Sequence, residues 1–352
     1  MDCLPEELIS YIFDFLHAEA ALSSAMLVSQ RWYMYGARNL HHTIDLCIGP
    51  SVTVNSCDVA VCFMKRLVSS PLSSAHLIRH LTLSGFAPLD IQELLLDILG
   101  RTTHLLSLNM HALHILQGGM HFPQEIFSSP TFLPNLVALN ASSAPFSVSL
   151  VQTRQYVEAL RVHEPMDDAL LRRLLGSGFT QKAKLLELAL SVDSTTAAIA
   201  RVGILASALA GGPLCALALQ FDMDRPKPVS WEEFEGLITE VGQRLQCLQN
   251  LRRLSIVTRP DPPIAVTASD RLTGDSRREM MTRQLAERLL TDSELSSLER
   301  IELRWHGWKI QDGKMVAVPR TQLMRGPHRW LFEAPGSSRY HCSSGRRVLL
   351  GQ

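Results

Sequence analysis

A short apolar pattern that returns along most of the chain constrains the fold more than any other feature. An apolar residue is followed by two others, then leucine, one other and an apolar residue, as in Ile78-x-x-Leu81-x-Leu83. Further copies, the first of them with a weak first position, lie at Leu106–Leu108, Leu136–Ala141, Val157–Val162, Leu185–Leu190, Leu214–Leu219, Leu251–Ile256 and Leu298–Leu303. Such repetition predicts a solenoid or array, because one unit cannot bury its apolar face without a stacked neighbour.

Helical segments separate these short apolar strands. They are expected at residues 90–100, 168–176, 195–209, 231–245 and 276–290. Strands that alternate with helices predict a parallel sheet with helices on the outside. We therefore expect an α/β fold, with Ile44-x-Leu46 as the first strand.

Residues 46–334 resemble a leucine-rich-repeat domain with irregular repeats. The repeats lie roughly 20 to 45 residues apart, whereas regular ones of this family lie 20 to 29 apart. The asparagine that the family places in its turns is also missing, and the corresponding positions hold Phe86, His111, Ala144, Pro165, Asp193 and Asp222. We therefore expect other groups to hydrogen-bond the backbone amides of the turns.

The repeat also predicts a sheet face that points away from the core, because successive side chains of a strand alternate between its two faces. The residue between the two apolar positions forms one row, made of Asp45, Thr82, Ser107, Asn140, Arg161, Ala189, Ala218, Ser255 and Glu302. A second row follows two residues later, at Ser84, Asn109, Ser142, His163, Ser191, Gln220, Val257 and Arg304. The large groups Arg161, His163, Glu302 and Arg304 are the candidates for substrate binding. A solvated face without a partner is an equal alternative.

The pattern breaks twice towards the carboxyl end. Residues 259–275 contain three prolines and Gly274, and we expect a long loop there. Beyond Leu303 the chain is basic and aromatic, which suits a recognition surface but is better explained by an irregular cap with strands at residues 315–318 and 330–332. Residues 335–352 are expected to be a disordered tail.

The first forty-five residues follow a different pattern. Pro5 suits the first turn of a helix, and the acidic Glu6 and Glu7 suit its positive end. Apolar residues then recur with helical period as far as Leu16, and two more helices are expected at residues 19–28 and 29–38. Three short helices form a marginal core, so this module, residues 1–45, needs a partner or the following domain to stabilise it.

The module carries a family resemblance on Leu4-Pro5-x-Glu7-Leu8, Ile12-Phe13, Leu16, Leu22, Ala25, Val28-Ser29, Arg31-Trp32 and Ala37. Together these residues resemble an F-box, and the ending Leu40–Leu46 resembles the strand that often follows this motif in fungal F-box proteins. The resemblance implies that the module binds a Skp-type adaptor and, through it, a cullin, while the rest of the chain recruits a protein substrate. It assigns adaptor contact, or the core beneath it, to Leu4, Pro5, Leu8, Ile12, Leu16, Val28 and Trp32.

Two positions depart from the F-box pattern. Ser29-Gln30-Arg31 replaces the common cysteine and basic residue before the tryptophan, and residues 17–21 lack the Asp or Pro often found there. Neither change removes an apolar anchor. The alternative interpretation is an amphipathic helical cap that shields the end of a solenoid.

Composition limits the partners and the location. Thirty-four basic residues cancel 34 acidic ones, so the chain lacks the basic field that nucleic acids or anionic membranes attract, and neither is expected as a partner. The seven cysteines form no CxxC pair, and no secretory signal is visible, which favours a reduced intracellular chain. The uncharged stretch 202–220 contains Gly211-Gly212-Pro213 and predicts a soluble helix, turn and buried strand rather than a membrane span.

No familiar catalytic motif occurs in the sequence. The nucleophile elbow, the phosphate-binding loop and the dinucleotide fingerprint are all missing, so we expect neither an enzyme nor a cofactor. His76 and His80 have the spacing of a zinc-protease helix but no glutamate between them. A second group of histidines, at 104, 111, 114 and 121, has no intervening carboxylate or cysteine, and no metal site is expected at either place.

Three functional hypotheses remain. The first is a substrate-recognition subunit of an SCF-type cullin-RING ubiquitin ligase, in which the module binds the adaptor and the solenoid holds the protein to be modified. The second is a leucine-rich-repeat-like interaction scaffold with no ligase role. The third, an α/β enzyme, lacks any constellation of nucleophile and base.

Overall fold

The structure is a computed structural model that describes residues 5, 8–9, 11–13, 16, 22–49, 58–69, 74–87, 89–110, 113–115, 124–224, 229–259, 274–292, 295–304, 306–311 and 313–319. The chain divides into two compact units. The first unit contains Met1–Val137, and the second contains Ala138–His341. The expected loop at 259–275, the strand at 330–332 and the tail at 335–352 therefore fall mostly or wholly outside the described residues.

The first unit begins with the helical module. Residues 8–9, 11–13 and 16 are helical, and α2 (Leu22–Met26) and α3 (Gln30–His42) follow. Ser29 caps α3, because its side chain accepts a hydrogen bond from the Trp32 N–H at 3.1 Å. α3 ends four residues later than expected and passes into β1 (Thr43–Ile48) without a loop, which confirms Ile44-x-Leu46 as the first strand.

A parallel sheet completes the first unit. β1 pairs with β2 (His80–Ala87), which pairs in turn with β3 (Ser107–Met110) and β4 (Leu113–Ile115). The helical elements are α4 (Val59–Ser69), the 3-10 helix η1 (Ser74–Leu77), α5 (Leu89–Arg101) and α6 (Gln124–Ser128). Strands and helices alternate, as the sequence predicts.

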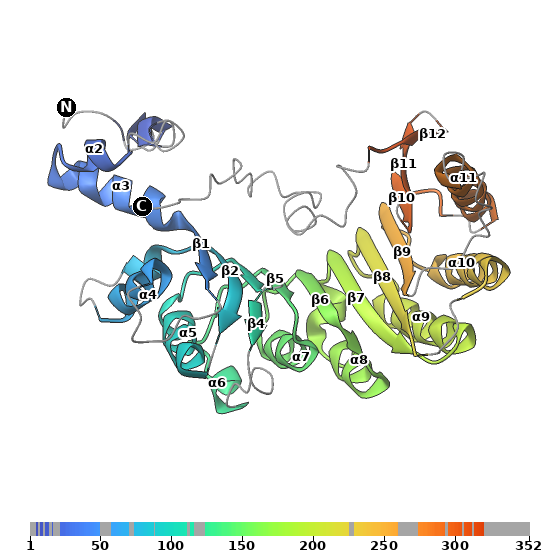
Figure 1. The fold of residues 1–352 in the computed structure, drawn as a ribbon, viewed down its shortest axis with the longest axis horizontal. Coiled ribbons are helices and arrows are strands. Elements are labelled where there is room, and N and C mark those ends of the chain that lie inside the picture. Colours follow the sequence, from blue (N-terminus) through green and yellow to red (C-terminus); the bar gives the residue numbers. More distant parts are fainter. Residues whose placement is uncertain are drawn as a thin grey trace. The chain divides into compact units, whose positions relative to one another are not determined.

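The second unit is a longer sheet of the same kind. Its parallel strands, in spatial order, are β5 (Ala138–Ala141), β6 (Ala159–Met166), β7 (Leu185–Val192), β8 (Ala216–Met223), β9 (Arg253–Arg259) and β10 (Arg300–Leu303). An antiparallel hairpin, β11 (His306–Gln311) and β12 (Lys314–Ala317), ends it. The helices α7 (Ala144–Thr153), α8 (Asp168–Leu175), α9 (Thr195–Leu209), α10 (Trp231–Leu245) and α11 (Gly274–Asp292) connect successive strands, and α7 to α10 lie along one face of the sheet (Figure 1). The α/β fold class is confirmed.

The repeated apolar residues form the core of both units. At each of eight copies the three apolar positions are at most 4% exposed, from Ile78, Leu81 and Leu83 to Leu298, Ile301 and Leu303. The backbone hydrogen bonds are just as regular. The carbonyl of the residue that follows the first apolar position accepts hydrogen bonds from two successive N–H groups of the next repeat. Arg79 does so for Leu106 and Ser107, and Cys215, Arg252 and others repeat the arrangement.

The predicted first row was wrong at two positions. Leu81 pairs with Leu108, so Thr82 lies beside Asn109 and not beside Ser107. Leu186 pairs with Leu217, which places Glu187 beside Ala218 where Ala189 was expected. The two copies therefore begin at Leu105 and Ala183. Both shifts are by two residues, which keeps the same side chains on each face.

Side chains at a constant position tie one repeat to the one before it. Asn135, just before the first apolar residue of its repeat, donates to the Thr103 carbonyl at 2.9 Å. Asn250 occupies the same position and donates to the Gly212 carbonyl at 2.9 Å, and Lys182 donates likewise to the main chain of the preceding repeat. These contacts join successive repeats at the amino ends of their strands.

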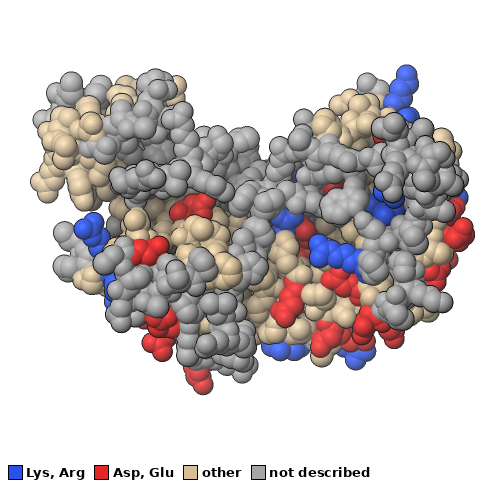
Figure 2. All heavy atoms as spheres, in the orientation of Figure 1, with Lys and Arg blue, Asp and Glu red and all other residues tan. Residues whose placement is uncertain are grey.

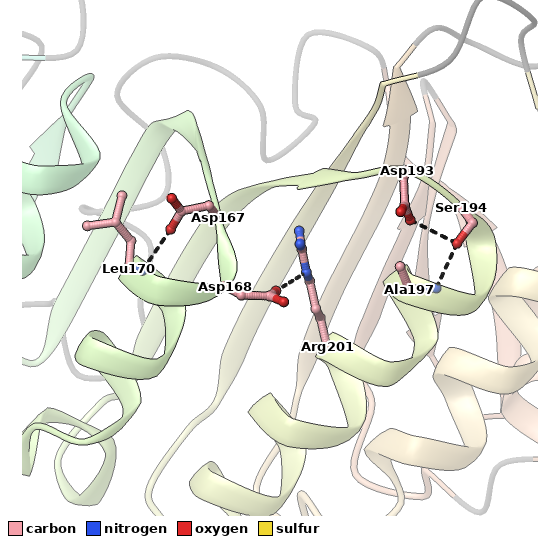
Figure 3. Close-up of polar contacts among 7 residues, drawn as sticks. All are labelled: Asp167, Asp168, Leu170, Asp193, Ser194, Ala197 and Arg201. Carbon is pink, nitrogen blue, oxygen red and sulfur yellow. Dashed lines mark hydrogen bonds and ion pairs between the residues drawn. The ribbon is translucent and has the colours of Figure 1, made fainter.

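At the other end of the strands, helix caps satisfy the turn amides. The Asp167 carboxylate accepts from the Leu170 N–H at 2.8 Å, and the Ser194 hydroxyl accepts from the Ala197 N–H at 3.2 Å (Figure 3). Ser230 forms a capping box with Glu233 in the same way at α10. The expectation that other groups would replace the missing turn asparagines is confirmed at these helices.

The uncharged stretch 202–220 spans the end of α9, a turn at Gly211 with φ +73°, and most of β8, as predicted. Leu205, Leu209 and Leu217 are buried in the core of the second unit. None of the helices that the structure describes has the length and apolar character needed to cross a membrane.

A joint of aromatic rings connects α3 to the first repeat. The His41 ring stacks on Phe63 of α4 at 6.0 Å, and the His42 ring lies 5.1 Å from that of His80 in β2. The Arg79 N–H also donates to the His42 carbonyl at 3.0 Å. The last turn of α3 is thus fixed against the sheet of the first unit.

Gly85 is required where β1 and β2 meet. Its φ is +93°, and a Cβ there would lie 1.9 Å from the Ile48 carbonyl oxygen. Gly85→Ala should lower the free energy of unfolding by more than about 3 kcal/mol, because backbone must move to admit the methyl group. Gly236 in α10 is the matched control, since its Cβ would meet open space and Gly236→Ala should stabilise by about 1 kcal/mol. Urea unfolding of both variants would test this, and equal effects would contradict it.

The joint should weaken in acid. Burial, and then the charges of His42 and Arg79, lower the pKa of His80 from 6.5 to about 4. The unfolded chain binds a proton as the pH falls through 6.5 and the folded chain only near 4, so the stability of the first unit is full above pH 6.5 and decreases towards 4. The loss should approach about 3 kcal/mol. Urea unfolding at several pH values should show a flatter profile for His80→Gln, and an unchanged profile would contradict the assignment.

Candidate functional site

The helical module has a small core of its own. Ile9, Phe13 and Ala25 are buried, and the Phe13 ring meets the edge of Trp32 at 5.4 Å and stacks on Tyr35 at 6.3 Å. Leu16 packs against the same cluster. Two residues of the predicted adaptor-binding set, Leu16 and Trp32, therefore support the core of the module.

Gly36 allows α3 to approach the other helices closely. A Cβ at this position would lie 2.1 Å from Met26 Cγ and 3.2 Å from Phe13 Cε1. A larger residue would force the Met26 side chain away from the core. The residue type at position 36 thus sets how tightly the three helical segments pack.

Outside this core, the module exposes many large apolar side chains. Leu8 and Tyr11 are one helical turn apart and are 51% and 73% exposed. Leu27 and Val28 follow α2, and Tyr33 and Met34 lie on α3, with exposed fractions of 87%, 63%, 53% and 64%. We call these six residues the apolar surface. Apolar side chains gathered on so small a module are typical of a protein-binding site.

The predicted adaptor-binding residues divide between the core and this surface. Leu8 and Val28 belong to the apolar surface, Pro5 is exposed and Ile12 is half-buried. Leu4 lies outside the described residues. Tyr11, Leu27, Tyr33 and Met34 were not predicted as exposed binding residues. Each is an apolar residue that falls off the period of the buried positions, which is the signal that could have identified them.

The sheet face opposite the helices in the second unit carries the candidate substrate-binding residues. Strand register aligns Asn140, Arg161, Glu187, Ala218, Ser255 and Glu302 in one row. Arg161 is 2% exposed and forms an ion pair with Glu187. Glu302 is 1% exposed and accepts from the Arg300 guanidinium at 2.6 Å. Both predicted charges are thus buried and paired, Arg161 with the neighbouring strand and Glu302 within its own strand.

The second row is more accessible. His163 is half-buried, and its Nε2 lies 2.8 Å from Asn140 Oδ1. Gln220 on β8 is also half-buried and donates to the Asp222 carboxylate at 3.1 Å. His163 from β6 and Gln220 with Asp222 from β8 are therefore polar groups that a partner could reach. Gln220 stood in the predicted second row but was not singled out there because its side chain is neutral.

Arg304 lies outside the strand that was expected to carry it. β10 ends at Leu303, and Arg304 occupies the turn to β11 with φ +58°. Its amide donates to the Ile256 carbonyl at 3.0 Å, and its side chain is buried. The four predicted substrate-binding residues therefore do not form one exposed cluster.

Charge on the described surface is mixed. Acidic and basic side chains are interspersed on the face that Figure 2 shows, without one large region of a single sign. Several acidic groups cap or brace helices, such as Asp167, and Asp168 forms an ion pair with Arg201 at 2.5 Å (Figure 3). The described charges on this face therefore indicate no preference for a strongly charged partner.

The histidine groups do not assemble into a metal centre in the part of the chain that the structure describes, where no three His, Cys, Asp or Glu side chains come close enough to hold an ion. His76 lies in η1 and His80 in β2, so the two do not share a helix. His104 is exposed, and the other predicted histidines, 111, 114 and 121, have no described side chain.

Comparison with known proteins identifies the module. Residues 1–47 match the family model described as F-box-like. No curated protein matches the chain. F-box proteins are typically non-catalytic adaptors that bind a Skp-type partner. The chain therefore carries an F-box-like domain at its N-terminus, followed by a long domain built on a mostly parallel sheet.

Proposed function

We propose that this chain is the substrate-recognition subunit of an SCF-type cullin-RING ubiquitin ligase. The F-box-like module binds a Skp-type adaptor, and the sheet-based region, proposed as an irregular leucine-rich-repeat-like solenoid over residues 46–334, binds a protein substrate. No residue of this chain performs covalent chemistry in this role, and no cofactor is involved. The location is intracellular, where such ligases act.

The apolar surface is the observation that carries the proposal. A module with a core as small as Ile9, Phe13 and Ala25 gains little stability from burial, and six large apolar side chains in water add nothing to it. A partner that covers them removes several hundred Å² of apolar area from water, which at about 25 cal/mol per Å² is ample for stable association. The match of residues 1–47 to the F-box-like family makes a Skp-type adaptor the partner.

The arrangement of the first unit supports the same role. α3 belongs to the module and runs straight into β1, and its last turn is held by Phe63 and His80. A partner bound at Tyr33 or Met34 of α3 is therefore connected to the sheet through one continuous helix. Such a joint would hold a bound adaptor in a fixed position relative to the first repeats, because no flexible linker intervenes.

Substrate binding is proposed for the sheet face that the helices leave uncovered. The candidates predicted from the sequence are Arg161, His163, Glu302 and Arg304, to which the register adds Gln220 and Asp222. Since Arg161 and Glu302 are buried and ion-paired, they would shape this face, whereas His163 and Gln220 would touch the substrate.

Charge placed on the apolar surface should abolish adaptor binding. Val28→Asp with Met34→Asp should weaken binding of a purified Skp-type adaptor at least about tenfold, because each carboxylate would be buried without a partner. Ile204→Asp is the matched control, since Ile204 is 47% exposed on α9 and distant in sequence from the module. Calorimetry of the full-length variants gives the affinities, and circular dichroism checks their folding.

If the intact wild-type chain failed to bind the adaptor, the ligase role would be overturned and the interaction scaffold would be favoured. Substitution of Trp32 is not a clean test, because its ring packs on Phe13 and the variant would lose part of the core.

Substrate capture should depend on the second row and not on the module. In pull-down mass spectrometry from the native cell type, His163→Ala with Gln220→Ala should lose a set of proteins that wild type retains, while adaptor and cullin remain. The Val28→Asp, Met34→Asp variant should show the reverse. Arg172→Ala, an exposed change on α8, is the control and should lose neither. Retention of every captured protein by the double alanine variant would contradict the assignment.

A further inference from the structure

Arginine is far more frequent than lysine in this chain. Of 34 basic residues, only Lys65, Lys182, Lys184, Lys227, Lys309 and Lys314 are lysines, and 28 are arginines. Lysine is ordinarily among the commonest residues of a soluble domain. Residues 1–47, the F-box-like module, contain no lysine, and neither do residues 66–181.

The fold does not require arginine at many of these positions. Arg252 pairs with Glu299 at 3.3 Å and Arg283 with Glu287 at 3.0 Å, and all four side chains are about half exposed. Arg288, paired with Glu235, is 53% exposed. An exposed pair of this kind contributes about 0.2 to 1 kcal/mol and is made equally well by lysine. What distinguishes the two residues here is chemical reactivity and not stability.

Of the two basic residues, only lysine can accept ubiquitin at its side chain. Its ε-amine nitrogen attacks the carbonyl carbon of the ubiquitin thioester on the conjugating enzyme, an isopeptide bond forms, and the carbon–sulfur bond breaks. The enzyme cysteine leaves as the thiol and takes up the proton that the amine loses. The arginine guanidinium stays protonated and delocalised at any physiological pH and does not attack.

One described lysine is held by its neighbours. Lys182 is half-buried, and its amine donates to the Arg154 carbonyl at 3.1 Å and to the Gln155 carbonyl. Lys184 pairs with Glu158 at 2.7 Å, but it is 49% exposed, and the pair is of the same weak kind as those of Arg252 and Arg283. Lys65 on α4, Lys309 on β11 and Lys314 on β12 are exposed as well. Among the described residues, these four are therefore the accessible acceptors.

We propose that the scarcity of lysine makes this chain a poor acceptor of ubiquitin while it holds a substrate in the ligase. The inference rests on the proposed function, because only a receptor fixed near the charged conjugating enzyme is exposed to repeated transfer. Its own surface is then spared, and transfer is directed to the substrate. Residual self-modification is confined to Lys65, Lys184, Lys309 and Lys314 and to Lys227, which lies outside the described residues.

A reconstituted ligase tests this inference. The full chain is assembled with adaptor, cullin, RING subunit, conjugating enzyme and ubiquitin, and ubiquitin on the receptor is quantified by mass spectrometry. The variant Arg252→Lys, Arg283→Lys, Arg288→Lys should be modified about twice as much as wild type, since three exposed amines join the four that the structure describes as exposed. The control Arg252→Gln, Arg283→Gln, Arg288→Gln loses the same pairs without adding amines and should match wild type.

The outcomes separate the two proposals. If the complex assembles and the triple lysine variant gains no modification at positions 252, 283 and 288, the inference is wrong while the ligase role stands. If the wild-type chain does not assemble with the adaptor, the proposed function fails and the inference fails with it. A second variant, Lys65→Arg, Lys184→Arg, Lys309→Arg, Lys314→Arg, should lose most of the residual signal, and an undiminished signal would also overturn the inference.

Discussion

Stacking of three apolar side chains per repeat is the interaction on which the rest of the structure depends. At every copy the positions equivalent to Ile78, Leu81 and Leu83 are almost wholly removed from water. One copy cannot bury them without the next, so the strands must lie parallel and in register. Repeat length is then free to vary, because insertions lengthen the helix or loop outside this core. The irregular spacing of the repeats is therefore compatible with a regular sheet.

This constraint also determines the opposite face of the sheet. Once Leu160, Leu186 and Leu217 are aligned, the residues next to them, Arg161, Glu187 and Ala218, must lie side by side as well. Neighbouring charges of opposite sign then pair along the sheet, as Arg161 and Glu187 do. A charged residue that looks like a binding group in the sequence can thus form an ion pair with the adjacent strand and be unavailable to a partner. The polar groups that a partner can reach are then the less conspicuous His163 and Gln220.

Much of the fold was predictable from the sequence, and the errors have physical reasons. The bounds of α9 and α10 follow from cap residues Ser194 and Ser230 and from helical periodicity. The copies at Leu105 and Ala183 were misplaced by two residues because a shift of two keeps the same face buried, and only pairing with a neighbour distinguishes the registers. The hairpin of β11 and β12 was only half predicted, since it carries no repeat. The pairing of Arg161 and the turn at Arg304 depend on contacts between strands that no single-strand pattern contains.

In the F-box-like module, unlike in the sheet, many large apolar side chains stay exposed. Its core consists of little more than Ile9, Phe13 and Ala25, and Gly36 shows that even this small core needs close helix packing. Its remaining apolar side chains therefore stay outside, where a partner can cover them. A partner that binds only the folded module stabilises it in proportion to the logarithm of its concentration relative to its Kd. The exposed apolar residues that make the isolated module marginally stable thus couple its folding to partner binding. The last turn of α3 connects the module to the sheet.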